Sequence, residues 1–154
     1  MRIFLDANLL FSAGKADGAI RRFIKLLLKN GHTLVADPYV KEEAERNIQL
    51  KYPESRQDLA VILGTISNQQ SATTPELLDS SIILDEKDRP VLAAAIKSGC
   101  GLLITGDATH FGALFGKTVQ GVLILSPRQA AMYCFSFPAL PVSLCPRALQ
   151  AAVS

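Results

Sequence analysis

Acidic residues follow two apolar runs of this sequence, and a third lies on a predicted helix between them. Asp6 comes directly after the run 2–5, and Asp107 follows the run 101–105 with one glycine between. Short apolar runs of this kind predict buried strands, and open α/β sheets build their sites at the carboxyl ends of the strands. We therefore expect Asp6 and Asp107 to lie at the same edge of a sheet.

The third acid, Asp88, lies on the apolar stripe of a helix. Counting from it, hydrophobic residues follow at i+3, i+4, i+7 and i+8, namely Val91, Leu92, Ala95 and Ile96. A carboxylate on this line is costly unless a cation or a hydrogen-bond donor meets it. Because the helix ends at 98–99 and leads into the strand before Asp107, one helix–strand unit carries both acids toward the same edge.

A fourth acid is expected on a helix that runs from Pro38 to about 50, with Asp37 as its N-cap. On the 3.6-residue period, Glu43 and Glu45 flank the inward stripe on either side. Glu43 lies nearer the helix start, and hence nearer the predicted strand edge, so we prefer it. The helical periodicity alone does not exclude Glu45.

Four carboxylates gathered at one place repel one another, and a divalent cation relieves that repulsion. Oxygen ligands without His or Cys favour Mg²⁺ or Mn²⁺ over zinc. Such an ion can polarise a phosphoryl oxygen and lower the pKa of an attacking water. The acids therefore predict a metal-dependent phosphodiesterase site.

Strand-like and helix-like segments alternate along the chain, which predicts a three-layer α/β/α fold with a central, mostly parallel twisted sheet. The predicted strands are 2–5, 33–36, 82–84, 101–105 and 122–125. The predicted helices cover about 20–28, 38–50, 53–66, 88–98 and 127–133.

The length of 154 residues fits one domain, and 49% apolar with 19% charged residues argues against disorder. We expect a nuclease-type domain at 1–134 and an apolar tail at 135–154 that packs or meets a partner. Three cysteines without CxxC spacing, no export signal and no long apolar run predict a cytoplasmic protein that spans no membrane. The net charge of +2 does not by itself indicate a nucleic-acid partner.

Four segments together resemble the PIN-domain family of VapC-like ribonucleases over most of residues 1–125. They read DANLLFSA, DPYVKEEAERNI, DEKDRPVLAAAIKSG and LLITGDATHF. The resemblance implies an endoribonuclease that hydrolyses RNA phosphodiester bonds with Mg²⁺ or Mn²⁺. It also implies the toxin of a toxin–antitoxin pair, an antitoxin protein as partner and a homodimer.

Matched position by position, the resemblance assigns the catalytic acids to Asp6, Glu43, Asp88 and Asp107, with Asp6, Asp88 and Asp107 as the metal ligands. Asn8 and Thr105 fall where the family keeps polar residues that line the site, and Ser12 is added to them as a hydrogen-bonding candidate. Many members carry a further acid shortly after the fourth, but positions 108–110 read Ala-Thr-His here. This departure implies that a second metal is weakly held.

Other interpretations compete with these. Asp85 reads as a helix-start residue or a supporting acid, and His110 as a half-buried histidine rather than a base. Arg21, Lys25 and Lys29 form a basic helix face that is usually just solvated, and they are weak candidates for RNA phosphate contacts. A PIN-like binding module without turnover is the alternative function. A phosphoacceptor receiver domain ranks low, because one acid rather than a pair follows the first strand.

Overall fold

A computed structural model describes residues 1–68 and 78–135 of the chain, in which strands and helices alternate. The predicted tail therefore lies outside the described residues except for Phe135. The strands are β1 (Arg2–Leu5), β2 (Thr33–Ala36), β3 (Ser67–Asn68), β4 (Leu102–Ile104), β5 (Thr118–Val119) and β6 (Val122–Leu125). The helices are α1 (Ala7–Lys15), α2 (Ala19–Lys29), α3 (Pro38–Lys51), α4 (Arg56–Gly64), α5 (Arg89–Lys97), α6 (Ala108–Phe111) and α7 (Pro127–Phe135), with short 3-10 turns at Pro53–Ser55 and Gly112–Leu114.

The six strands form one sheet in the order β3-β2-β1-β4-β6-β5, parallel except for β5. In the centre, Leu5 of β1 lies beside Ile104 of β4. Both strands therefore end at the same edge, one residue before Asp6 and three before Asp107. This register confirms the expected meeting of the two strand ends.

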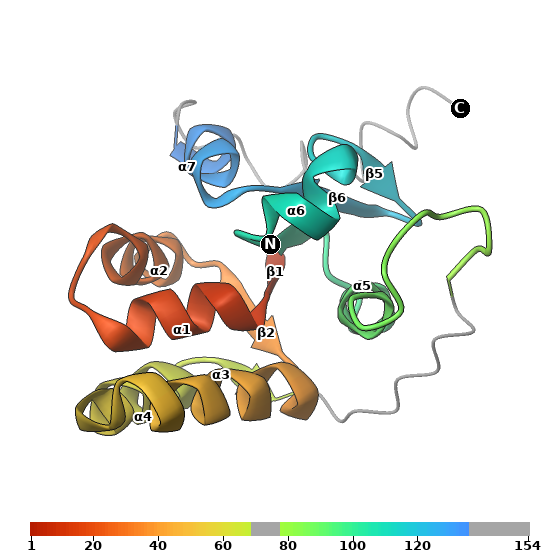
Figure 1. Cartoon of the computed structure of the whole chain (residues 1–154). Helices are drawn as coiled ribbons and strands as arrows, with labels where there is room; N and C mark the ends of the chain where they lie inside the picture. The colour runs from red at the N-terminus through yellow and green to blue at the C-terminus, as the bar shows by residue number, and fades with distance from the viewer. Residues whose placement is uncertain (69–77, 136–154) are drawn as a thin grey trace.

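Helices cover both faces of the sheet (Figure 1). α2 and α7 contact each other and pack on β2 and β6, whereas α5 packs on β4 from the opposite side. This arrangement confirms the predicted three-layer α/β/α fold. None of the helices that the structure describes combines the length and apolar composition needed to cross a bilayer.

α1 follows Asp6 without a loop and packs against α3 and α4. Gly14, in its last turn, allows this close approach, because a Cβ there would lie 3.0 Å from the Cβ of Leu59 on α4. The sequence did not predict α1. Its buried residues follow helical spacing, but three of the five are alanine or glycine, so the apolar stripe is weak in the sequence; they are Ala7, Leu9, Leu10, Ala13 and Gly14.

The predicted strand at 82–84 is wrong, since this segment has no regular structure. The side chain of Ile83 is 92% exposed. The carbonyl of Ile82 accepts a 2.8 Å hydrogen bond from the guanidinium of Arg89, which fixes the segment against the start of α5. A short apolar run alone does not distinguish a strand from an irregular segment with this support.

β5 pairs antiparallel with β6 through the two-residue turn Gln120–Gly121, in which both residues have positive φ angles of 47° and 87°. Positive φ at both central positions is typical of the turns that match the twist of a hairpin. The sheet therefore ends in a short hairpin on the β6 side.

Candidate functional site

Asp6 is the most buried acid at the strand edge, with 6% of its surface exposed. Its Oδ2 accepts a 2.7 Å hydrogen bond from the Thr105 hydroxyl, and its Oδ1 accepts one of 2.7 Å from the backbone N–H of Ala7. Burial raises the pKa of Asp6 to about 6. The two hydrogen bonds lower this pKa, whereas the negative charges of Glu43 and Asp88 raise it further. Asp6 therefore lies in the electrostatic field of two other predicted catalytic acids.

Thr105 and Asn8, both predicted to line the site, connect the two strand ends. The Thr105 hydroxyl accepts hydrogen bonds from the backbone N–H of Asp107 at 3.1 Å and from the amide of Asn8 at 3.4 Å. The Oδ1 of Asn8 accepts a 3.0 Å bond from the N–H of Gly106. These bonds fix the loop that carries Asp107 relative to Asp6.

Asp107 is paired with His110, one turn further along the chain. Its Oδ2 lies 2.6 Å from the imidazole Nδ1, and its Oδ1 accepts a 3.1 Å bond from the backbone N–H of the histidine. Burial alone would raise the pKa of Asp107, but the hydrogen bonds from His110 outweigh it and the pKa is lowered. The same contact raises the pKa of His110. With the proton on Nδ1, the second nitrogen Nε2 is available as an acceptor or ligand.

His110 also faces two acids on the segment before α5. Its Nδ1 lies 3.5 Å from Asp88 Oδ2, and its Nε2 lies 3.9 Å from Asp85 Oδ2. Asp88 Oδ2 is a buried atom without a hydrogen-bond partner, and burial raises the pKa of this carboxyl. Sequence reasoning did not place His110 beside these acids, since its only signal was its place in the usual position of a further acid.

Asp85, Asp88 and His110 each offer one ligand atom, and these atoms all lie within 4.8 Å of one another. Among the described residues, this is the group of three His, Cys, Asp or Glu side chains whose ligand atoms lie close enough together to hold one metal ion. It shares only Asp88 with the predicted metal ligands. The negative charge of Asp88 acts on Asp6, and Asp107 contacts the imidazole of His110.

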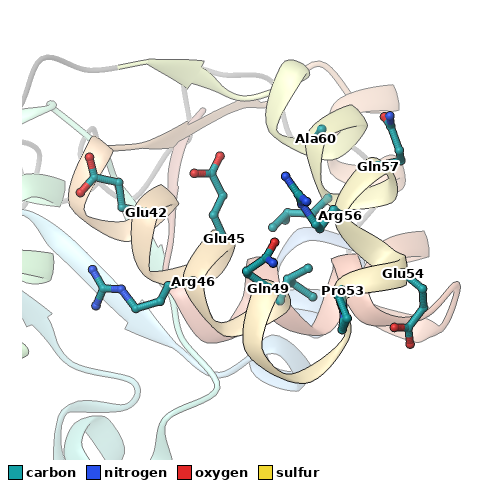
Figure 2. Close-up of a pocket in the computed structure, with 11 residues that line it drawn as sticks. Glu42, Glu45, Arg46, Gln49, Pro53, Glu54, Arg56, Gln57 and Ala60 are labelled. Carbon is teal, nitrogen blue, oxygen red and sulfur yellow. The ribbon is translucent and has the colours of Figure 1, made fainter.

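The structure separates the two candidate acids of α3. Glu43 acts electrostatically on Asp6, as described above. Glu45 instead lines an open groove of about 900 Å³ between α3 and α4 (Figure 2). Glu43 is thus the α3 acid whose charge acts on Asp6, and the groove is a separate feature. Its remaining lining residues are Glu42, Arg46, Ile48, Gln49, Pro53, Glu54, Arg56, Gln57, Leu59 and Ala60.

The remaining predicted residues lie on α1 and α2. Ser12 is half-buried on α1. Arg21 is held inside the fold, because its guanidinium donates to the carbonyls of Ala13 and Gly14 and contacts Asp58. Lys25 and Lys29 are exposed. α2 ends at Lys29, just before β2 begins, which places this lysine toward the edge opposite Asp6 and Asp107.

The side chains at this edge fit a divalent cation. Asp6 and Asp88 carry raised pKa values from burial, and one oxygen of Asp88 has no hydrogen-bond partner. A cation would stabilise the ionised form of both. The oxygen-rich donor set suits Mg²⁺ or Mn²⁺, and the imidazole of His110 adds a nitrogen that first-row transition ions accept more readily.

Several solved structures are similar to this fold. VapBC2 from Rickettsia felis bound to a DNA fragment of its promoter matches with a TM-score of 0.61 and 17% identity, covering 82% of this chain and 98% of that one. Mycobacterium tuberculosis VapC20, a toxin that cleaves the sarcin-ricin loop, matches with a TM-score of 0.51 and 14% identity, covering 72% and 94%. No curated protein matches the sequence.

The family model of the PIN domain matches residues 2–109, which include Asp6, Glu43, Asp88 and Asp107. This match covers well over half of the chain, and the sheet order and strand-end acids described above agree with it. The chain belongs to the PIN-domain family.

Proposed function

We propose that this protein is a metal-dependent endoribonuclease that acts as the toxin of a toxin–antitoxin pair in the cytoplasm. The observation that carries the proposal is the buried Asp6, whose pKa is raised to about 6 partly by the charges of Glu43 and Asp88. Acids held together in this way at a strand edge are costly to the fold, and a bound cation offsets that cost. Membership of the PIN family supports RNA hydrolysis as the use of that cation.

In this proposal Asp6, Asp88 and Asp107 bind the metal, as expected from the sequence, and Asp85 and His110 join them. When bound by these residues, Mg²⁺ or Mn²⁺ would polarise a phosphoryl oxygen of the RNA and lower the pKa of an attacking water. Thr105 orients the carboxylate of Asp6, and His110 orients that of Asp107. The negative charge of Glu43 acts on Asp6, so a cation bound there is stabilised further.

An antitoxin partner follows from the same proposal. One of the similar solved structures is a VapBC complex, and the other is a VapC toxin. We propose that a partner protein covers the acidic edge in the resting cell and that the chain forms a homodimer. Size-exclusion chromatography with light scattering tests the dimer, and co-purification of the product of the neighbouring reading frame tests the antitoxin.

Cleavage of a labelled RNA in Mn²⁺ tests the nuclease. The wild type should cut, whereas Asp6→Asn, Asp107→Asn and Glu43→Gln should lose about 100-fold or more of the rate. Glu45→Gln is the matched control on α3 and should retain activity. Equal rates in all variants would reject the proposed site. Stable RNA binding by a wild type that never cuts would favour a binding module instead.

A further inference from the structure

Tyr39 lies in the first turn of α3, one helical turn before Glu43. Residues four apart on a helix share a face, so the phenol ring lies on the side of α3 that carries the site acid. The side chain is 42% exposed. The ring pairs described elsewhere in the structure are Phe11 with Tyr52 and Phe23 with Phe135, so the Tyr39 ring is not part of an aromatic pair in the described residues.

The Tyr39 side chain reaches the segment that precedes α5. Its hydroxyl donates a long hydrogen bond of 3.5 Å to the backbone carbonyl of Lys87, on the segment that carries Asp85 and Asp88. Burial raises the pKa of the hydroxyl, and the charges of Glu43 and Asp88 raise it further. The phenol therefore stays protonated as a donor, and it stands within the electrostatic reach of both acids.

An acidic site must attract RNA by something other than its own charge. The carboxylates repel phosphates at the place where a phosphodiester has to sit. Stacking of a base on an aromatic ring contributes about 1–3 kcal/mol and does not depend on that charge. Lys87 supplies a cation nearby: it is exposed, and its charge acts on Asp88, Asp107 and His110.

We propose that the exposed ring of Tyr39 is a stacking platform for one unpaired nucleobase of the RNA, next to the scissile phosphate, and that Lys87 contacts a neighbouring phosphate. The inference rests on the proposed nuclease function and assigns it a positioning residue. The base must be unpaired, because both faces of a base inside an RNA duplex are already stacked. Tyr39 thereby makes the site select single-stranded positions within a longer RNA.

Binding of a fluorescein-labelled single-stranded RNA to an Asp107→Asn background, followed by anisotropy, tests this platform. Tyr39→Ala and Tyr39→Leu should weaken binding by about 5- to 150-fold, whereas Tyr39→Phe should keep it. Tyr39→Leu retains apolar bulk, so its loss cannot be assigned to a folding defect when its melting temperature matches the wild type. Tyr52→Ala is the control, because Tyr52 is 38% exposed but packs on Phe11.

An abasic scan of the same RNA locates the partner base. One abasic position should weaken binding to the Tyr39-containing protein but not to Tyr39→Ala, and binding of a blunt RNA duplex should be equal for both. Equal affinity of Tyr39→Ala and the parent, or a loss in Tyr39→Phe as large as in Tyr39→Ala, would overturn the inference. Failure of the nuclease proposal is seen separately, as a wild type that cuts no RNA in Mn²⁺.

Discussion

The Thr105 hydroxyl donates a 2.7 Å hydrogen bond to Asp6 Oδ2, and both side chains are buried. The same oxygen accepts the backbone N–H of Asp107, so one threonine connects two acids from distant parts of the sequence. The acid that follows β1 and the hydroxyl that follows the neighbouring strand β4 thus form a single unit of the site.

Replacing Thr105 should show how much this hydrogen bond contributes to the free energy of unfolding. Thr105→Val keeps the shape but leaves a buried Asp6 oxygen without its donor, which should lower the free energy of unfolding by about 1–3 kcal/mol. Thr105→Ser keeps the hydroxyl and should lose less. Urea unfolding in EDTA measures both. A valine variant as stable as the serine variant would contradict the role given to the hydroxyl.

The raised pKa of Asp6 predicts that the metal-free protein is less stable at neutral pH than at pH 4. The folded pKa of about 6 lies above the ordinary aspartate value of 3.8, so the folded state binds more protons between these two pH values. Stability should therefore fall as pH rises through about 6, by about 3 kcal/mol from this group. Urea unfolding across pH 4–8 in EDTA measures it.

Asp6→Asn removes this titration and is the control for that experiment. The difference between wild type and Asp6→Asn isolates one carboxyl from all other titrating groups. A difference that stays constant across pH 4–8 would show that the Asp6 pKa is not raised. Added Mn²⁺ should restore stability to the wild type at pH 7, because the ion binds the folded form.

His110 should decide which ion the site prefers. His110→Ala removes a nitrogen ligand and the partner of Asp107, so Mn²⁺ affinity should fall on the order of 10-fold or more, with a smaller loss for Mg²⁺. Isothermal titration with each ion measures both constants. Thr109→Ala, at an exposed neighbour, is the control. Equal losses for the two ions would show that the imidazole only orients Asp107.

Gly14 tests the packing of the last turn of α1 against α4. In Gly14→Ala the new Cβ would meet the Cβ of Leu59 at 3.0 Å, so the α1–α4 contact must widen. We expect a net loss on the order of 1 kcal/mol, since overpacking exceeds the gain in helix propensity. Gly64→Ala is the control: its Cβ meets nothing within 4 Å, and its stability should not fall.

The sequence was sufficient for the central strands and the strand-end acids. Apolar runs at β1, β2, β4 and β6 are long enough to be recognised, and each is followed by its next element in a pattern typical of parallel sheets. It was not sufficient for β5, since a strand of two residues is defined by backbone pairing rather than by side-chain pattern.

The candidate site residues also fall into two groups, those placed by local sequence order and those placed by tertiary contacts. Asp6 and Asp107 were predictable because their positions depend on local order: strand first, acid next. The place of His110 was not predictable, since it depends on contacts with Asp85 and Asp88, more than twenty residues earlier in the chain. The choice between Glu43 and Glu45 likewise depended on where α3 docks, and periodicity carries no information on docking.

The two outer strands of the sheet are only two residues long each. A flank this brief offers few free backbone donors and acceptors to a neighbouring molecule, which is how natural sheets avoid growing into polymers. The protein should therefore tolerate the high concentrations that NMR titration with RNA requires, without fibrillar association through its sheet.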